Sequence, residues 1–248
     1  WDAARVGAGA PTRSSRGGWM SDLLLLGLAT AAFVAGHELL SHPLRAPLVA
    51  AIGEKGFALV YSVIALASLG GAVELWKRIP PDRLWQAPGW AYALELPVML
   101  FAFILFIGSM TAPNPALMGG GVPGTSNVRG VQRLTRHPMM WSFALWAIVH
   151  IALSADPRTI ILAGGILTLA LFGARMQDGK KRMQNPAYAD HMAATAFVPL
   201  GAQFRGRQPW SALFPGLVPV AGGLILFAIV LWLHPMLMGV PANQLGMH

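Results

Sequence analysis

The chain has no cysteine and little charge. Of its 248 residues, 11% are Asp, Glu, Lys or Arg, against about 25% in a typical soluble domain. The lack of cysteine excludes disulfides, iron–sulfur clusters, thiolate ligation of haem and cysteine nucleophiles. Any transition metal in this protein therefore has to bind through histidine, methionine or carboxylate side chains.

Hydrophobic residues are correspondingly abundant. Hydrophobic residues make up 55% of the chain, and the mean hydropathy is +0.54. A helix that crosses a bilayer needs about 20 mostly apolar residues, and such stretches lie at roughly 22–41, 57–76, 92–112, 138–155, 158–176 and 212–234. The sequence therefore predicts an all-α fold, a polytopic transmembrane helical bundle of about six spans.

The two ends of the chain differ in composition from its middle. Residues 1–19 are polar and rich in Gly, Ser and Arg, and we expect a disordered leader or a gene-start artefact there. Residues 20–240 are expected to form a single transmembrane helical domain, followed by a short tail at 241–248.

The basic residues indicate the orientation in the membrane. The net charge is +8, and the expected connections at about 42–56, 113–137 and 175–211 hold most of the Lys and Arg residues. Because positively charged loops stay in the cytoplasm, we expect both termini outside. Such loops are typical of topology determinants that contact anionic lipid, and we expect no binding of nucleic acid.

Three histidines in or beside apolar stretches are candidate ligands. Arg136 and His137 open one stretch, His150 follows thirteen residues later, and His37 lies in another. A histidine in hydrocarbon needs a partner, for which a metal or a haem iron is common; hydrogen bonding between helices is the alternative. Thirteen residues span about 20 Å of helix, so His137 and His150 cannot share one iron. His37 is therefore the expected second ligand, and expected membrane depth favours its pairing with His137.

Other polar residues give simpler expectations. Arg175 and Asp178 are three residues apart on one helix, so we expect an ion pair. His191, in a polar loop, is expected at the surface, and His234 has no evident partner. The Gly- and Pro-rich connection 112–136 is interpreted as either a lid over a site or a tether.

Three glycine pairs lie in the apolar stretches, at residues 70–71, 164–165 and 222–223. Glycine lets two helix backbones approach closely, so the pairs predict helix–helix packing. A flat macrocycle lying against such a face is the alternative.

An ordered series of motifs runs from about Leu23 to Phe204. It comprises HELLSHPLR at 37–45, GEKGF at 53–57, YS at 61–62, LTRHP at 134–138, WAIVH at 146–150, FGAR at 172–175 with Asp178, PAY at 186–188 and FVPL at 197–200. In this series the chain resembles the NnrU family of bacterial membrane proteins, which is similar to the plant and cyanobacterial 15-cis-zeta-carotene isomerases.

The resemblance implies a haem b protein of the bacterial inner membrane, with axial ligands at the positions of His37 and His150. It implies either isomerase-like, redox-gated chemistry on a hydrophobic small molecule or a role in denitrification and nitric oxide metabolism. This pairing disagrees with the depth argument. Because span boundaries inferred from a sequence err by several residues, we take His37 and His150 as the metal ligands and keep His137 as the alternative. Arg136 is a further candidate for cofactor binding, and no catalytic residue is assigned.

Two other hypotheses stay open. The Arg136-His137-Pro138 opening of a helix, followed by a Tyr-containing loop, is also similar to the isoprenylcysteine carboxyl methyltransferase superfamily, which implies S-adenosylmethionine binding near Arg136 and His137. The chain has Gln177-Asp178-Gly179-Lys180 where that superfamily has an acidic pair, which argues against methyl transfer. The second is a non-catalytic accessory subunit that binds a membrane respiratory complex.

Overall fold

A computed structural model describes residues 13–111, 128–154 and 156–239, and these residues form helices and turns without a strand. The α-helices are α1 (Arg13–Ser41), α2 (Arg45–Arg78), α3 (Gly89–Thr111), α4 (Pro138–Ser154), α5 (Pro157–Gln184), α6 (Tyr188–Ala194), α7 (Gly201–Phe204) and α8 (Leu217–Met238). Two 3-10 helices, η2 (Gly130–Arg133) and η3 (Trp210–Leu213), lie in the connections.

The prediction of an all-α membrane protein is confirmed. Five described helices are long and apolar enough to cross a membrane, and the shorter α4 is also apolar. The protein is therefore a multi-pass membrane protein in a lipid bilayer. The chain divides into two compact units, residues 1–84 with 156–165, and residues 85–155 with 166–248.

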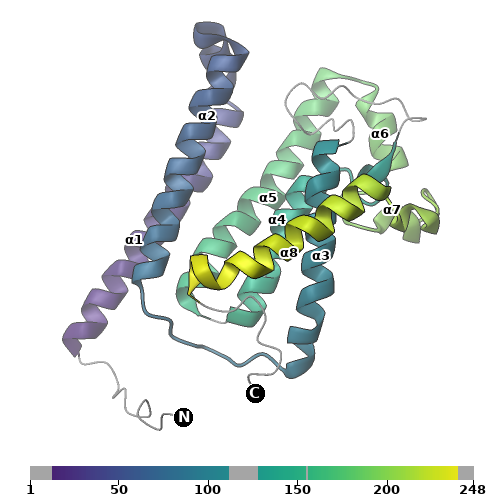
Figure 1. The fold of residues 1–248 in the computed structure, drawn as a ribbon. Helices are drawn as coiled ribbons and strands as arrows, with labels where there is room; N and C mark the ends of the chain where they lie inside the picture. Colours follow the sequence, from purple (N-terminus) through teal and green to yellow (C-terminus); the bar gives the residue numbers. More distant parts are fainter. Residues whose placement is uncertain (1–12, 112–127, 155, 240–248) are drawn as a thin grey trace. The chain divides into compact units, whose positions relative to one another are not determined.

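In the first unit, α1 and α2 pack side by side (Figure 1). The chain turns at residues 42–44, and α2 begins at Arg45 with Pro47 in its first turn, where a missing backbone N–H leaves no hydrogen bond unmade. The prediction of a loop at 42–56 is therefore wrong, because helix resumes at once. Gly53 interrupts α2 with φ 73° and ψ 168°, a conformation that glycine adopts without steric cost.

The start of α5 is fixed against the end of α2 within the same unit. Asp156 accepts a hydrogen bond from the backbone N–H of Thr159 at 3.0 Å, and Trp76 Nε1 donates to Thr159 Oγ1 at 3.1 Å. The Arg158 guanidinium lies 4.1 Å from the Trp76 ring centroid and donates to the Ile79 carbonyl at 2.7 Å. These contacts satisfy backbone groups at two helix ends, which otherwise lack partners.

In the second unit, α3 packs against both α4 and α8 (Figure 1). A buried cluster of Leu105, Val131 and Leu134 links α3 to the segment before α4. The prediction of a connection at 175–211 is wrong in part, because α5 continues to Gln184 and α6, α7 and η3 follow.

Two of the three glycine pairs pack against neighbouring helices. A Cβ on Gly223 would lie 2.9 Å from the backbone of Ile104 in α3, and a Cβ on Gly165 would overlap Thr30 of α1. These contacts confirm the packing prediction for both pairs. A Cβ on Gly70 or Gly71 would instead meet nothing within 4 Å, so a flat ligand against that face stays a prediction.

Three predictions fall wholly or partly outside the described residues. The proposed lid or tether at 112–136 is described only from residue 128, and the proposed leader only from residue 13, where α1 begins. The short tail at 241–248 lies wholly outside them.

Candidate functional site

His37 lies one turn before the end of α1 and is partly buried. Its Nδ1 is 3.0 Å from the carbonyl oxygen of Phe33, four residues earlier. Since a carbonyl oxygen can only accept a hydrogen bond, Nδ1 carries the proton and the neutral ring has its lone pair at Nε2. The ring contacts Phe33 and Tyr61 edge to face, with centroids 4.4 and 5.2 Å away. The imidazole is thus oriented by its own helix and by an aromatic ring of α2.

His150 repeats this arrangement one turn before the end of α4. Its Nδ1 lies 2.8 Å from the carbonyl oxygen of Trp146, again four residues earlier, and the Trp146 ring stacks on it at 4.3 Å. Nε2 is therefore again the nitrogen with the free lone pair. His234 of α8 interacts electrostatically with His150, a proximity that the sequence did not indicate.

A buried polar cluster forms around Asp178, in the last turns of α5. Arg136 donates from Nε at 2.8 Å and from a terminal guanidinium nitrogen at 2.7 Å to Oδ2. His137 Nε2 and the Tyr188 hydroxyl each lie 2.8 Å from Oδ1. Because both partners of this oxygen donate, the Asp178 carboxylate is satisfied, and the Arg136 charge is neutralised at the same point. We call Arg136, His137, Asp178, Tyr188 and His191 the Asp178 cluster.

Backbone pairing brings the cluster together. The N–H of Arg136 donates to the Ala196 carbonyl and the N–H of Leu200 donates to the Leu134 carbonyl, both at 2.9 Å. The ring of Phe197 then lies beside Arg136 and His137, with the guanidinium carbon 5.5 Å from the ring centroid. The chain just before α4 is thereby fixed to the chain after α6.

His191 is the member of the cluster that the sequence misplaced. The polar loop around it predicts a surface position, but its ring is fully buried, and the Tyr188 ring lies 5.6 Å away. Both ring nitrogens lack a hydrogen-bond partner among the described residues, as does Nδ1 of His137. Burial, aided by the Arg136 charge, lowers the pKa of His191 to about 4, so the buried ring is neutral at pH 7.

Tyr188 keeps its proton for a related reason. Burial, together with the Asp178 charge, raises the pKa of the Tyr188 phenol above its usual value. The hydroxyl therefore stays a hydrogen-bond donor to Asp178 over the physiological pH range.

These two histidine sites and one carboxylate cluster can be compared with known proteins. The family model described as NnrU protein matches residues 24–242. The chain belongs to the NnrU protein family. Among curated proteins, it is 24% identical over 165 residues to the chloroplastic 15-cis-zeta-carotene isomerase of Arabidopsis thaliana, a match that covers 63% of this chain and 44% of the isomerase. This NnrU chain thus spans less than half of that relative's length. No solved structure matches it significantly.

In this NnrU protein the candidate ligands fall into different units. His37 belongs to the first unit and His150 to the second, so their sharing of one iron stays a prediction. Arg136 and His137 are brought together by their shared partner Asp178.

One expected ion pair is wrong. Asp178 pairs with Arg136, forty-two positions away in sequence, and not with Arg175. The exposed Arg175 guanidinium lies 5.9 Å from the Phe197 ring centroid instead. Arg175, the last residue of the motif Phe172-Gly173-Ala174-Arg175, thus contacts a ring that lies beside the Asp178 cluster.

Within the part of the chain that the structure describes, no group of three metal-ligating side chains occurs.

Proposed function

We propose that this NnrU family protein is a haem b protein of the membrane, with His37 and His150 as axial ligands of the iron. The observation that carries the proposal is the shared geometry of the two imidazoles. Each Nδ1–H donates to the carbonyl four residues earlier, so each ring presents Nε2. A histidine that ligates a metal through one nitrogen commonly donates the other N–H to a carbonyl or carboxylate, which fixes the tautomer.

The residues around the two histidines fit a flat apolar group. Phe33 and Tyr61 contact the His37 ring edge to face, and Trp146 stacks on the His150 ring. Apolar surroundings of this kind restrict access of water to a metal site. In the first unit, a Cβ added at Gly70 or Gly71 of α2 would meet nothing within 4 Å, so a flat group could approach the backbone there. When bound, haem b would supply a redox-active iron. His37 and His150 would bind it, and their hydrogen bonds would hold the rings in orientation.

The chemistry that we propose is isomerase-like and acts on a hydrophobic small molecule. Support comes from the 24% identity to an enzyme named as an isomerase of 15-cis-zeta-carotene. A role in nitric oxide metabolism is the alternative, and it would use the same histidines. The methyltransferase alternative is less favoured by the geometry, because Asp178 already pairs with the Arg136 guanidinium and with His137 Nε2.

The first experiment is the visible spectrum of the full chain, purified in detergent after haem-replete expression, oxidised and then reduced with dithionite. We expect a six-coordinate, low-spin haem signal. His37→Ala and His150→Ala should each abolish the low-spin signal, because each removes one axial ligand. A purified wild-type protein without a Soret band would refute the proposal.

Three matched variants assign the ligands. His137→Ala, His191→Ala and His234→Ala each remove an imidazole that we do not assign to the iron, and we expect all three to keep the low-spin spectrum. If the low-spin spectrum is lost in His137→Ala but kept in His150→Ala, the second ligand is His137. Restoration of the His37→Ala or His150→Ala spectrum by added imidazole would show that the fold is intact.

We also propose that the protein lies in the bacterial inner membrane with both termini outside. The basic character of the connections supports this orientation. The chain has no cysteine, so single substitutions can be labelled without background. In intact cells, Lys55→Cys should be protected from a membrane-impermeant thiol reagent and Lys77→Cys should react with it. The reverse pattern would show that the protein has the opposite orientation.

A further inference from the structure

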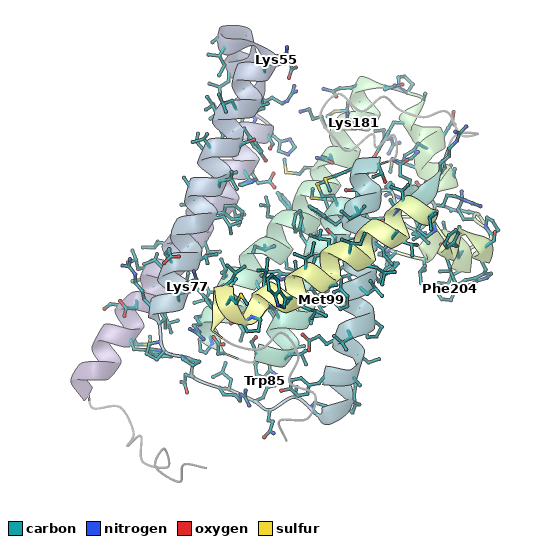
Figure 2. The ribbon with its side chains drawn as sticks, viewed as in Figure 1. Lys55, Lys77, Trp85, Met99, Lys181 and Phe204 are labelled. Atoms are coloured by element: carbon teal, nitrogen blue, oxygen red, sulfur yellow. The ribbon has the colours of Figure 1, made fainter. Side chains whose placement is uncertain are left out.

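The segment from Phe204 to Trp210 presents an unusual surface on the second unit. Phe204 is 75% exposed and Trp210 is 50% exposed, and their rings meet edge to face with centroids 5.1 Å apart. Arg205 and Arg207 lie between them and are also exposed. Figure 2 shows the Phe204 side chain on α7, at the edge of its unit.

The segment has a defined backbone conformation. The Ala202 carbonyl accepts hydrogen bonds from the N–H groups of Arg207 and Gln208, at 2.8 and 3.3 Å, around a turn in which Gly206 has φ 67°. Gln208 also accepts from Arg133 Nε at 2.9 Å and donates to the Ala194 carbonyl at 3.0 Å. The inward side of the segment is thus fixed, and its aromatic and cationic side chains are the ones left outside.

The position of the segment relative to the hydrocarbon is set by α8. The apolar stretch that can cross the membrane begins at Trp210 and continues to Met238. Arg205 and Arg207 precede it by three to five residues, which places them at the depth of the lipid headgroups. Aromatic residues are typical of this interface, where one end of the ring is apolar and the other is hydrated.

The two guanidinium groups lack a counter-charge in the protein. Neither has a hydrogen-bond or ion-pair partner in the part of the chain that the structure describes. No Asp or Glu occurs anywhere in the sequence after Asp190. A ligand that neutralises them therefore comes from outside this segment, and arginine is well suited to phosphate because its planar fork can donate two hydrogen bonds to it.

We propose that Arg205 and Arg207 bind the phosphate of an anionic phospholipid, whose acyl chain packs against Phe204 and Trp210. The exposed apolar residues that follow continue this surface toward the hydrocarbon; they are Leu213, Phe214, Leu217 and Val218. The site is independent of the proposed haem ligands, since it contains no histidine.

The test is native mass spectrometry of the full chain in detergent, with phosphatidylglycerol and phosphatidylcholine of identical acyl chains. We expect wild type to retain phosphatidylglycerol at least tenfold more tightly than phosphatidylcholine. The double variant Arg205→Gln/Arg207→Gln should bind phosphatidylglycerol about 30-fold more weakly, because each basic residue near an anionic surface contributes about 1 kcal/mol and 1.4 kcal/mol is a factor of ten.

Lys181→Gln/Arg182→Gln is the matched control, since it removes the same charge from the end of α5, where Figure 2 labels Lys181. This control should keep the phosphatidylglycerol preference. Phe204→Ala should weaken both lipids severalfold while keeping the preference, because the aromatic contact does not depend on the headgroup. A thermal unfolding curve in phosphatidylcholine that matches wild type would show that each variant is folded.

Three results would overturn the proposal. They are equal retention of the two lipids by wild type, an unchanged preference in the Arg205/Arg207 double variant, and equal stabilisation of wild type by inorganic phosphate alone. The last result would show that the arginines bind free anions rather than lipid.

Discussion

His37 on α1 and His137 just before α4 are partly buried and buried, respectively, but their ring nitrogens are used differently. In the first unit, His37 donates Nδ1–H to its own helix and has Nε2 available. In the second unit, Nε2 of His137 is hydrogen-bonded to a carboxylate that also binds Arg136 and Tyr188. A histidine whose hydrogen bonds stay within its own helix leaves a nitrogen for a ligand, whereas one that joins three chain segments contributes to the fold.

The glycines show the same contrast. Gly223 in the second unit is covered by Ile104, whereas Gly70 and Gly71 in the first unit face open space. At Gly70 and Gly71 the α1–α2 pair is thus more open than α8 is at Gly223. Substitutions at the covered positions of the second unit should therefore lower stability, whereas substitutions at the open face of α2 should not.

The largest effect should come from Asp178→Ala. Removing the carboxylate leaves the Arg136 guanidinium, 11% exposed, without its counter-charge, and breaking a buried pair on one side costs about 3–5 kcal/mol. We expect the free energy of unfolding, measured in mixed detergent–SDS micelles, to fall by that amount. His37→Ala, as the control in the open region, should change it by under about 1 kcal/mol. An equal loss in both variants would remove the distinction between the regions.

The next effect is the pH dependence of stability that His191 contributes. Its pKa is about 4 in the folded protein and about 6.5 in the unfolded chain. The unfolded chain therefore takes up this proton first as the pH falls, so this residue favours unfolding between pH 6.5 and 4. The free energy of unfolding should fall by up to about 3 kcal/mol over this range, because a difference of one pKa unit corresponds to about 1.36 kcal/mol.

His191→Leu should remove this part of the pH dependence. Because both ring nitrogens lack a partner among the described residues, the substitution should leave the free energy of unfolding at pH 7 unchanged or increase it. A His191→Leu variant with the wild-type pH dependence would show that another group titrates in this range.

A smaller effect separates the two kinds of glycine. Gly223→Ala places a methyl group 2.7 Å from a side-chain carbon of Ile104 and 2.9 Å from its backbone, and such overpacking costs about 1–3 kcal/mol. Gly71→Ala meets nothing within 4 Å and should stabilise α2 by about 0.5–1 kcal/mol through helix propensity. Thermal unfolding of the two variants should shift in opposite directions; destabilisation by both would mean that the α2 face is covered.

The smallest effect should come from Arg45→Gln. Arg45 pairs with Glu54 at 2.9 Å, but the Glu54 side chain is 62% exposed, and exposed ion pairs contribute about 0–1 kcal/mol. We expect the free energy of unfolding of this variant to equal that of wild type within experimental error. A loss comparable to that of Asp178→Ala would show that this end of the first unit is buried by a partner.

The sequence predicted the spans well because hydropathy measures the transfer of whole helices into lipid. It did not predict the partner of Asp178, since Arg175 is the local choice on the same helix and Arg136 is reached only through the pairing of residues 134–136 with 196–200. It placed His191 at the surface for the same reason: the neighbouring residues are polar, and its burial depends on tertiary contacts. A pattern in one sequence reports local periodicity, and these two residues are determined by contacts between distant segments.

Two lysines give the first unit an internal measure of membrane depth. Lys55 and Lys77, which both follow the interruption of α2 at Gly53, mark the two ends of the apolar stretch of this helix (Figure 2). They are separated by about 33 Å of helix, close to the roughly 30 Å thickness of the hydrocarbon layer. Tyr61, which contacts His37, lies about 9 Å along the helix from Lys55. We therefore expect the His37 imidazole to lie in the hydrocarbon near the membrane surface that Lys55 marks, so a group bound at its Nε2 would lie close to the lipid headgroups.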